Sequence, residues 1–72
     1  MLLASCKEFE ITASEVPKDL MAVFNAKYPN AKNVEWEAEK EEGKFYYEAA
    51  WKENGKKIEV HISPDGTISE AD

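Results

Sequence analysis

The chain contains no arginine, and its 72 residues include only one cysteine, three glycines and three prolines. A single cysteine excludes an internal disulfide framework and any multi-cysteine metal site. All nine basic residues are lysines and fifteen residues are acidic, which gives a formal net charge of -6. This charge has the wrong sign for binding phosphates, so we expect no nucleic-acid partner. No apolar run approaches the roughly 20 residues of a membrane-spanning helix.

A chain of 72 residues has room for one small domain, with one layer of helix on one sheet. The pattern predicts a helix over residues 17–28, because Pro17 suits the first position of a helix and Pro29 cannot continue one. Apolar residues recur at spacings of three and four, at Leu20, Val23, Phe24 and Tyr28. This stripe indicates a helix that packs against another element.

The segments after the helix alternate between apolar and polar residues, which is typical of half-buried strands. Their apolar rows are Val34, Trp36 and Ala38; Phe45, Tyr47, Ala49 and Trp51; and Ile58, Val60 and Ile62, with Ile68 in a short last strand. Turn signals separate them at Glu42-Gly43, at Asn54-Gly55 and over residues 63–66. Two-residue loops would pair Trp51 with Ile58 and Trp36 with Ala49, so apolar rows meet. We therefore predict an α+β fold in which one N-terminal helix packs on a four-stranded antiparallel meander sheet.

Residues 1–13 lack the regular pattern, and we assign them to a leader remnant or tether that precedes a domain over residues 14–72. Within them, Leu3-Ala4-Ser5-Cys6 resembles a bacterial lipobox, which implies lipidation at Cys6. The alternative is an ordinary N-terminus with a free thiol. Phe9 and Ile11 alternate with polar residues, so they could instead supply an extra strand or pack beneath the helix. The sequence leaves these alternatives open.

Several of these features resemble the PepSY-like, beta-lactamase-inhibitor-like family of secreted bacterial proteins. The features are Val16-Pro17 at the start of the helix, Tyr28-Pro29-Asn30-Ala31 at its end, the following Val34-Glu35-Trp36, and Asp65-Gly66. The likeness spans about residues 14–70. It implies a helix on a four-stranded antiparallel sheet, location in the cell envelope, either periplasmic or at the surface, and no known enzymatic activity. Family members often carry two such repeats, whereas this chain has one.

The polar row of the predicted sheet is strongly acidic, and we take it as the candidate partner surface. Its residues are Glu35, Glu37, Glu39, Tyr46, Glu48, Glu59 and His61. The predicted register sets Glu37 opposite Glu48, a destabilising like-charge pair. Such a face could bind a basic partner or divalent cations, with Tyr46 as an aromatic contact, or it could serve solubility alone.

The sequence offers little for catalysis or metal binding. His61 and Glu48 are expected to be cross-strand neighbours, but one histidine and one carboxylate do not make a metal site, and Cys6 has no orienting partner. We therefore predict no catalytic, cofactor or metal residues, and a non-catalytic exported module that binds or inhibits a protein or peptide through its sheet face or edge. Alternatives are a self-associating envelope domain that dimerises through a sheet edge, or a small metal-dependent enzyme. Membrane contact is expected only through a lipid anchor at Cys6.

Overall fold

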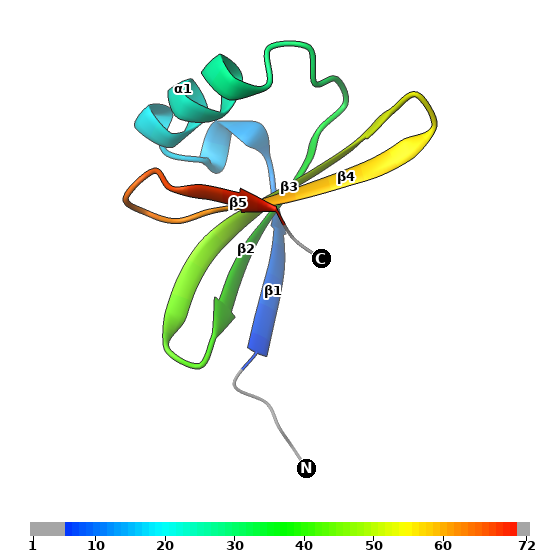
Figure 1. Ribbon diagram of the computed structural model, residues 1–72. Coiled ribbons are helices and arrows are strands. Elements are labelled where there is room, and N and C mark those ends of the chain that lie inside the picture. The colour runs from blue at the N-terminus through cyan, green and yellow to red at the C-terminus, as the bar shows by residue number, and fades with distance from the viewer. Residues whose placement is uncertain (1–5, 71–72) are drawn as a thin grey trace.

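The computed structural model describes residues 6–70 as an α+β fold with a single antiparallel sheet (Figure 1). The elements are β1 (Cys6–Ile11), η1 (Ala13–Glu15), α1 (Lys18–Lys27), β2 (Glu35–Glu41), β3 (Lys44–Glu53), β4 (Lys56–Ile62) and β5 (Ile68–Glu70). The strands lie in the order β1-β2-β3-β4-β5, so each pairs with its neighbours in sequence. In the part of the chain that the structure describes, no helix has the length and apolar character needed to cross a bilayer.

The sheet has five strands, so the predicted four-stranded sheet with an N-terminal helix is wrong in these two details. Residues 6–11, which we assigned to the tether, form β1 and pair with β2 along their whole length, ahead of the helix. Phe9 and Ile11 lie opposite Ala38 and Trp36. Of the alternatives that the sequence leaves open for these two residues, the extra strand is the one that the structure contains. A six-residue edge strand rich in charge gives a weak local signal, because its stability comes from pairing with a distant segment. Residues 3–5 of the lipobox-like motif lie outside the described residues, so lipidation at Cys6 stays a prediction.

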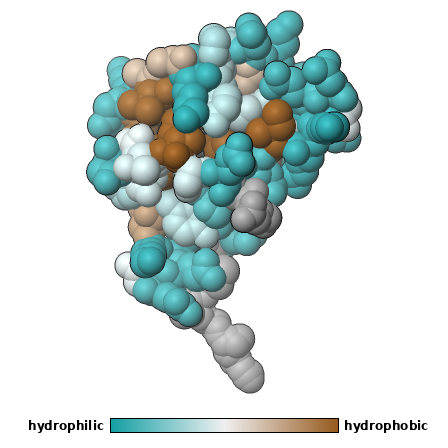
Figure 2. Space-filling model, viewed as in Figure 1, coloured by the Kyte–Doolittle hydropathy of each residue, from teal (hydrophilic) through white to brown (hydrophobic). Residues whose placement is uncertain are grey.

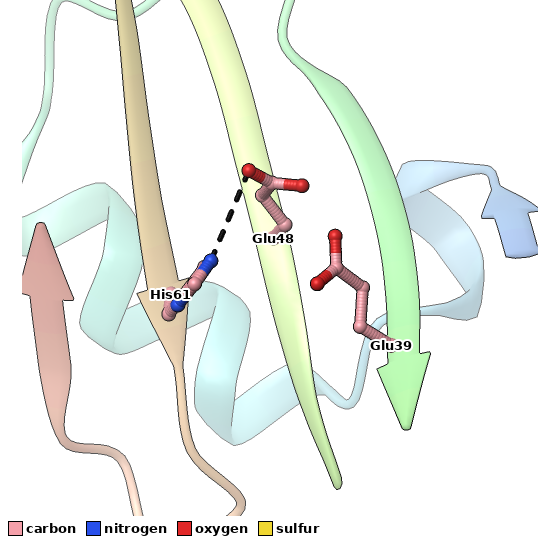
Figure 3. A group of neighbouring side chains, drawn as sticks. All are labelled: Glu39, Glu48 and His61. Carbon is pink, nitrogen blue, oxygen red and sulfur yellow. Dashed lines mark ion pairs between the residues drawn. The ribbon is translucent and has the colours of Figure 1, made fainter. Parts of the chain in front are cut away.

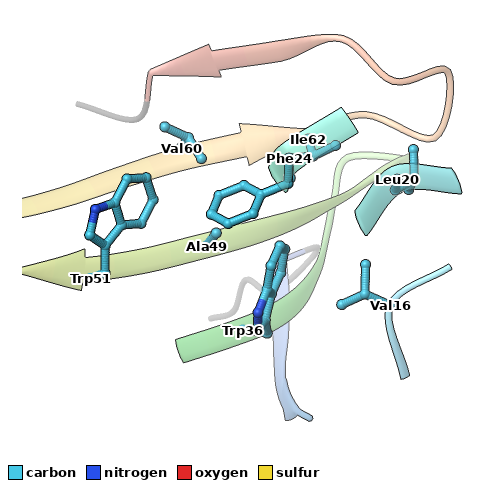
Figure 4. Close-up of a cluster of buried hydrophobic side chains, with 8 residues drawn as sticks. All are labelled: Val16, Leu20, Phe24, Trp36, Ala49, Trp51, Val60 and Ile62. Carbon is cyan, nitrogen blue, oxygen red and sulfur yellow. The ribbon is translucent and has the colours of Figure 1, made fainter. Parts of the chain in front are cut away.

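The core lies between α1 and one face of the sheet, which we call the inner face. Phe24 of α1 lies between Trp36 and Trp51, with ring centroids 4.9 Å and 5.4 Å away (Figure 4). The two tryptophans come from different strands and share this face, as their positions in the alternating pattern predicted. The buried core residues are Val16, Leu20, Phe24, Trp36, Ala49, Trp51, Val60 and Ile62. Burial of this apolar surface is the main force that holds the helix on the sheet.

The predicted register is confirmed in both long hairpins. Trp51 pairs with Ile58 and Trp36 pairs with Ala49. Both tight turns use two residues with positive φ, Glu42-Gly43 at 51° and 80° and Asn54-Gly55 at 54° and 80°. These angles match the type I′ turn that fits the twist of paired strands. The register in turn fixes which side chains share the other face, which we call the outer face.

The helix covers only part of the inner face. In Figure 1, β1 and the β2–β3 hairpin extend away from α1. Phe9 is 57% exposed and Phe45 is 43% exposed, although both belong to the apolar row of the sheet. Most of the surface seen in Figure 2 is hydrophilic, and its hydrophobic residues gather around α1 and the sheet beneath it. The exposed phenylalanines therefore lie where the single helix does not reach.

Candidate functional site

The outer face carries glutamates in two neighbouring cross-strand rows. Opposite residues on adjacent antiparallel strands point to the same side of the sheet. The first row is Glu10, Glu37, Glu48 and His61, one from each of β1 to β4. The second row is Glu8, Glu39 and Tyr46. Carboxylates thus face carboxylates at three strand-to-strand positions, an arrangement that costs stability.

Glu39 occupies the centre of this acidic face and is only 6% exposed. It lies between Glu8 on β1 and Tyr46 on β3. Among the described side chains, no lysine forms an ion pair with it. A buried carboxylate without a counter-ion is expensive unless hydrogen bonds or a shared proton compensate it.

His61 and Tyr46 flank the carboxylates on the β4 side. The imidazole Nε2 lies 3.9 Å from a carboxylate oxygen of Glu48, and Glu39 approaches Glu48 from the other side (Figure 3). The Tyr46 and His61 rings are 4.4 Å apart between centroids, and the Tyr46 hydroxyl donates a hydrogen bond to Glu41 at 3.3 Å. These two rings form the aromatic part of an otherwise acidic surface.

The carboxyl groups of Glu39 and Glu48 perturb one another. The hydrogen bond that a neutral Glu48 donates to Glu39 raises the pKa of Glu48 to about 8, and burial and the negative charge of Glu39 act in the same direction. For Glu39, burial favours a higher pKa, but the hydrogen bond from Glu48 and the nearby Tyr46 and His61 outweigh it and lower the pKa. Burial also raises the pKa of Glu37. Two carboxyl groups that share one proton behave in this way, because both cannot ionise cheaply at close range.

The same side chains offer ligand atoms for a cation. Glu39, Glu48 and His61 each present one such atom, all within 4.8 Å of one another, and Glu8, Glu37 and Glu39 form a second group of this kind. Carboxylate oxygen and imidazole nitrogen are ligands that zinc and similar divalent ions accept. The predicted register sets one carboxylate, Glu48, beside His61, whereas the structure places a second one, Glu39, there. Exposed acidic groups with this spacing are common without an ion, so the absence of a metal site stays a prediction.

Most of the predicted partner surface forms one shallow hollow of about 400 Å³. Six of the seven predicted residues line it, and the seventh, Tyr46, contacts the His61 ring at a tilt of 39°. Lys57 also lines the hollow, where it forms an ion pair with Glu59 at 3.2 Å. A second hollow of about 610 Å³ lies alongside and contains Lys32 and Lys52 as well as Lys57. The acidic surface is therefore bounded on one side by lysines.

β1 contributes two glutamates to this surface that are not among the residues predicted from the sequence. Glu8 lines the hollow, and Glu10 lies opposite Glu37. Their signal in the sequence is the alternation of Glu8 and Glu10 with Phe9 and Ile11, which does not by itself assign the segment to the sheet. Comparisons of the chain with known protein families, with curated proteins and with solved structures give no match.

Proposed function

We propose that this chain is a non-catalytic binding module that engages a positively charged segment of a protein or peptide through the outer face of its sheet. The observation that carries this proposal is the pair of facing carboxylate rows around the buried Glu39. The proton shared by Glu39 and Glu48 relieves only part of the mutual repulsion between the rows, and the isolated domain retains the rest. A cationic side chain placed among them would relieve that repulsion, so part of the binding energy is stored in the site.

The charge of the whole chain supports the same partner. A net charge of -6 attracts cations from a distance, and the acidic rows concentrate the field on one face. The rings of Tyr46 and His61, whose centroids are 4.4 Å apart, add an aromatic surface on which the alkyl chain of a lysine or the guanidinium group of an arginine could pack. Lysine- or arginine-rich segments fit these three features better than neutral or acidic ones.

Charge reversal on the outer face tests the proposal. The outer-face variant carries Glu10→Lys and Glu37→Lys, and the control variant carries Glu42→Lys and Glu70→Lys, both exposed positions. Both variants change the net charge equally. We expect a peptide of six lysines to bind the outer-face variant at least about tenfold more weakly than the parent, and the control within about threefold, by fluorescence anisotropy at low salt. Equal losses would mean that net charge alone matters and would contradict a defined surface.

We further propose, from the family resemblance, that the module works in the bacterial cell envelope as an inhibitor-like or adaptor domain, and that Cys6 anchors it to a membrane. A single acyl chain binds membranes only marginally, so a stable anchor would need several chains. Palmitate labelling in bacteria of a version that carries an export signal tests this, with Cys6→Ala as the control. Labelling that persists in Cys6→Ala would contradict the anchor at this residue.

A further inference from the structure

Resting on the proposed function, we propose that the occupant is an extended peptide with alternating basic and apolar residues, which adds as a sixth strand to the free edge of β1. Three features of the described chain meet at this edge: unpaired backbone groups, exposed phenylalanine on the inner face, and glutamates on the outer face. The partner that satisfies all three has a defined chemistry.

The free edge of β1 provides the backbone groups. All six residues of β1 pair with β2 on one side, and within residues 6–70 no strand pairs on its other side. On the opposite side of the sheet, β5 has only three residues and pairs with β4 only from Val60 to Ile62, so residues 56–59 of β4 form a shorter open stretch. A strand with unpaired N–H and C=O groups is a template for another chain, and peptides use such edges in β-augmentation. β1 is therefore the longer available edge.

The inner face beside this edge is apolar and uncovered around Phe9, although Lys40 of β2 lies at the far end of this area, opposite Phe45. Phe9 is 57% exposed and lies opposite Ala38. Beyond them, the rings of Phe45 and Tyr47 are 5.1 Å apart in an edge-to-face arrangement, and α1 does not extend over this part of the sheet (Figure 1). Apolar side chains of an added strand would lie next to Phe9 and Ile11 on this face and would remove that surface from water.

The outer face beside the same edge is acidic. Glu8 and Glu10 open the two carboxylate rows, and the carboxylates of Glu8, Glu37 and Glu39 lie within 4.8 Å of one another. Because side chains alternate between faces along a strand, a peptide whose apolar residues meet Phe9 and Ile11 presents its other residues to Glu8 and Glu10. Lysine or arginine at those positions would place cations in the rows, whereas glutamate would extend the repulsion.

A second copy of the chain fits this edge poorly. An antiparallel pair that keeps both inner faces on one side, with at least three β1 residues paired, can be centred on Lys7, Glu8, Phe9 or Glu10. Centring on Lys7, Glu8 or Glu10 sets that charged residue against itself, and centring on Phe9 sets Glu8 against Glu10 of the other copy. Each arrangement adds like-charge pairs to a chain that already carries -6. Charge complementarity thus favours a basic peptide over self-association.

Four synthetic peptides test the proposal with the full chain. The first alternates lysine and valine over seven residues, and the second has the same composition in two blocks. The third and fourth are the alternating peptide with N-methyl groups on alternate amides, in the two possible phases. We expect the alternating peptide to bind at least about tenfold more tightly than the block peptide. Of the two methylated peptides, we expect only one to bind as weakly as the block peptide, because only one set of alternate amides faces β1 and donates hydrogen bonds to it.

The outcomes separate this inference from the proposed function. Equal binding of the alternating and block peptides, or equal effects of the two methylation phases, would overturn strand addition and leave the acidic docking face intact. Binding by neither peptide would overturn both. Loss of binding in Phe9→Lys with retained binding in Phe45→Lys would support β1 as the edge used, since Phe45 lies two strands away on β3. A dimer in light scattering of the free chain that Phe9→Lys converts to a monomer would instead overturn the peptide as occupant, because a second copy would then use the edge.

Discussion

The contact with Glu39 raises the pKa of Glu48, and this gives the stability of the fold a pH dependence of unusual sign for a carboxyl group. The hydrogen bond to Glu39 raises the native pKa of Glu48 to about 8 from an ordinary value of 4.5. Between these values the unfolded chain has lost the proton and the native chain keeps it. Since stability falls with pH wherever the native state binds more protons, Glu48 lowers the free energy of unfolding from pH 4.5 to about pH 8.

Glu48→Gln should remove this pH dependence. The glutamine amide can still donate a hydrogen bond to Glu39, but it has no proton to lose. We expect the variant to match the parent near pH 5 and to be more stable by about 1–2 kcal/mol near pH 8, measured by urea unfolding across that range. Glu35→Gln removes the same formal charge from an exposed position and serves as the control. If both variants change stability in parallel at every pH, the shared proton is not the cause.

At the scale of elements, the two hairpin turns share a backbone geometry but differ in sequence. Glu42 and Asn54 occupy the same turn position, with φ of 51° and 54°. Asparagine tolerates this left-handed region much better than glutamate does. The β2–β3 turn therefore carries strain that the β3–β4 turn avoids.

Exchange of these two residue types provides a reciprocal prediction. Glu42→Asn should stabilise the fold by about 0.5–1 kcal/mol, and Asn54→Glu should destabilise it by a similar amount, both by thermal or urea unfolding. Glu42→Gln is the control for the change in charge, and we expect it to have little effect because glutamine is no better suited to positive φ. Equal stabilisation by Asn and Gln would show that charge, rather than backbone geometry, decides the effect.

The attachment of α1 depends on Phe24. Its ring is 2% exposed and contacts both tryptophans, whereas its neighbour Val23 is 39% exposed. Phe24→Leu should cost about 1–2 kcal/mol, because leucine fills the space poorly and loses the aromatic contacts. Val23→Ala on the same helix should cost less than about 0.7 kcal/mol. Urea unfolding, monitored by tryptophan fluorescence, measures both changes in the free energy of unfolding. Similar losses for Phe24→Leu and Val23→Ala would mean that other contacts hold the helix on the sheet.

The central elements could be predicted from the sequence because each has a strong local signal. Asn54-Gly55 fixes one hairpin, and the alternation around Trp36 and Trp51 fixes the faces. The first strand could not be assigned in the same way. Phe9 and Ile11 are only two apolar positions, and a helix separates them in sequence from Ala38 and Trp36, their partners. The pairing of β1 with β2 therefore depends on contacts between segments far apart in the sequence, which a local pattern does not reveal.

The candidate site was predictable to the same extent as the strands that carry it. The register placed Glu37 opposite Glu48 and Glu48 opposite His61, and both pairs are present. The approach of Glu39 to Glu48 depends on side-chain direction and burial, which alternation alone does not give. Glu8 and Glu10 joined the surface only through the unassigned β1. The proton shared by Glu39 and Glu48 could therefore not be predicted from the sequence.

In the molecule as a whole, the sheet separates an apolar inner face from an acidic outer face. One sheet face is occupied by α1 over part of its area, and the other presents carboxylates with a raised pKa at Glu48. With a net charge of -6, repulsion among the carboxylates of the acidic face lowers the stability of the domain, and salt screens this repulsion. Binding of a cation to that face should consequently be linked to both salt and protons.

Proton release on binding follows if the proposed function is right. At pH 7 Glu48 is mostly protonated, since its pKa is about 8, and a lysine brought beside it favours the ionised form. We expect binding of the six-lysine peptide to release roughly half a proton per complex and to strengthen from pH 6 to pH 9. Calorimetric titrations at pH 7 in PIPES and in Tris, which differ in ionisation enthalpy, measure the number directly. In Glu48→Gln the release should disappear while binding persists; an unchanged release would assign the proton to another group, and no release in the parent would contradict the linkage.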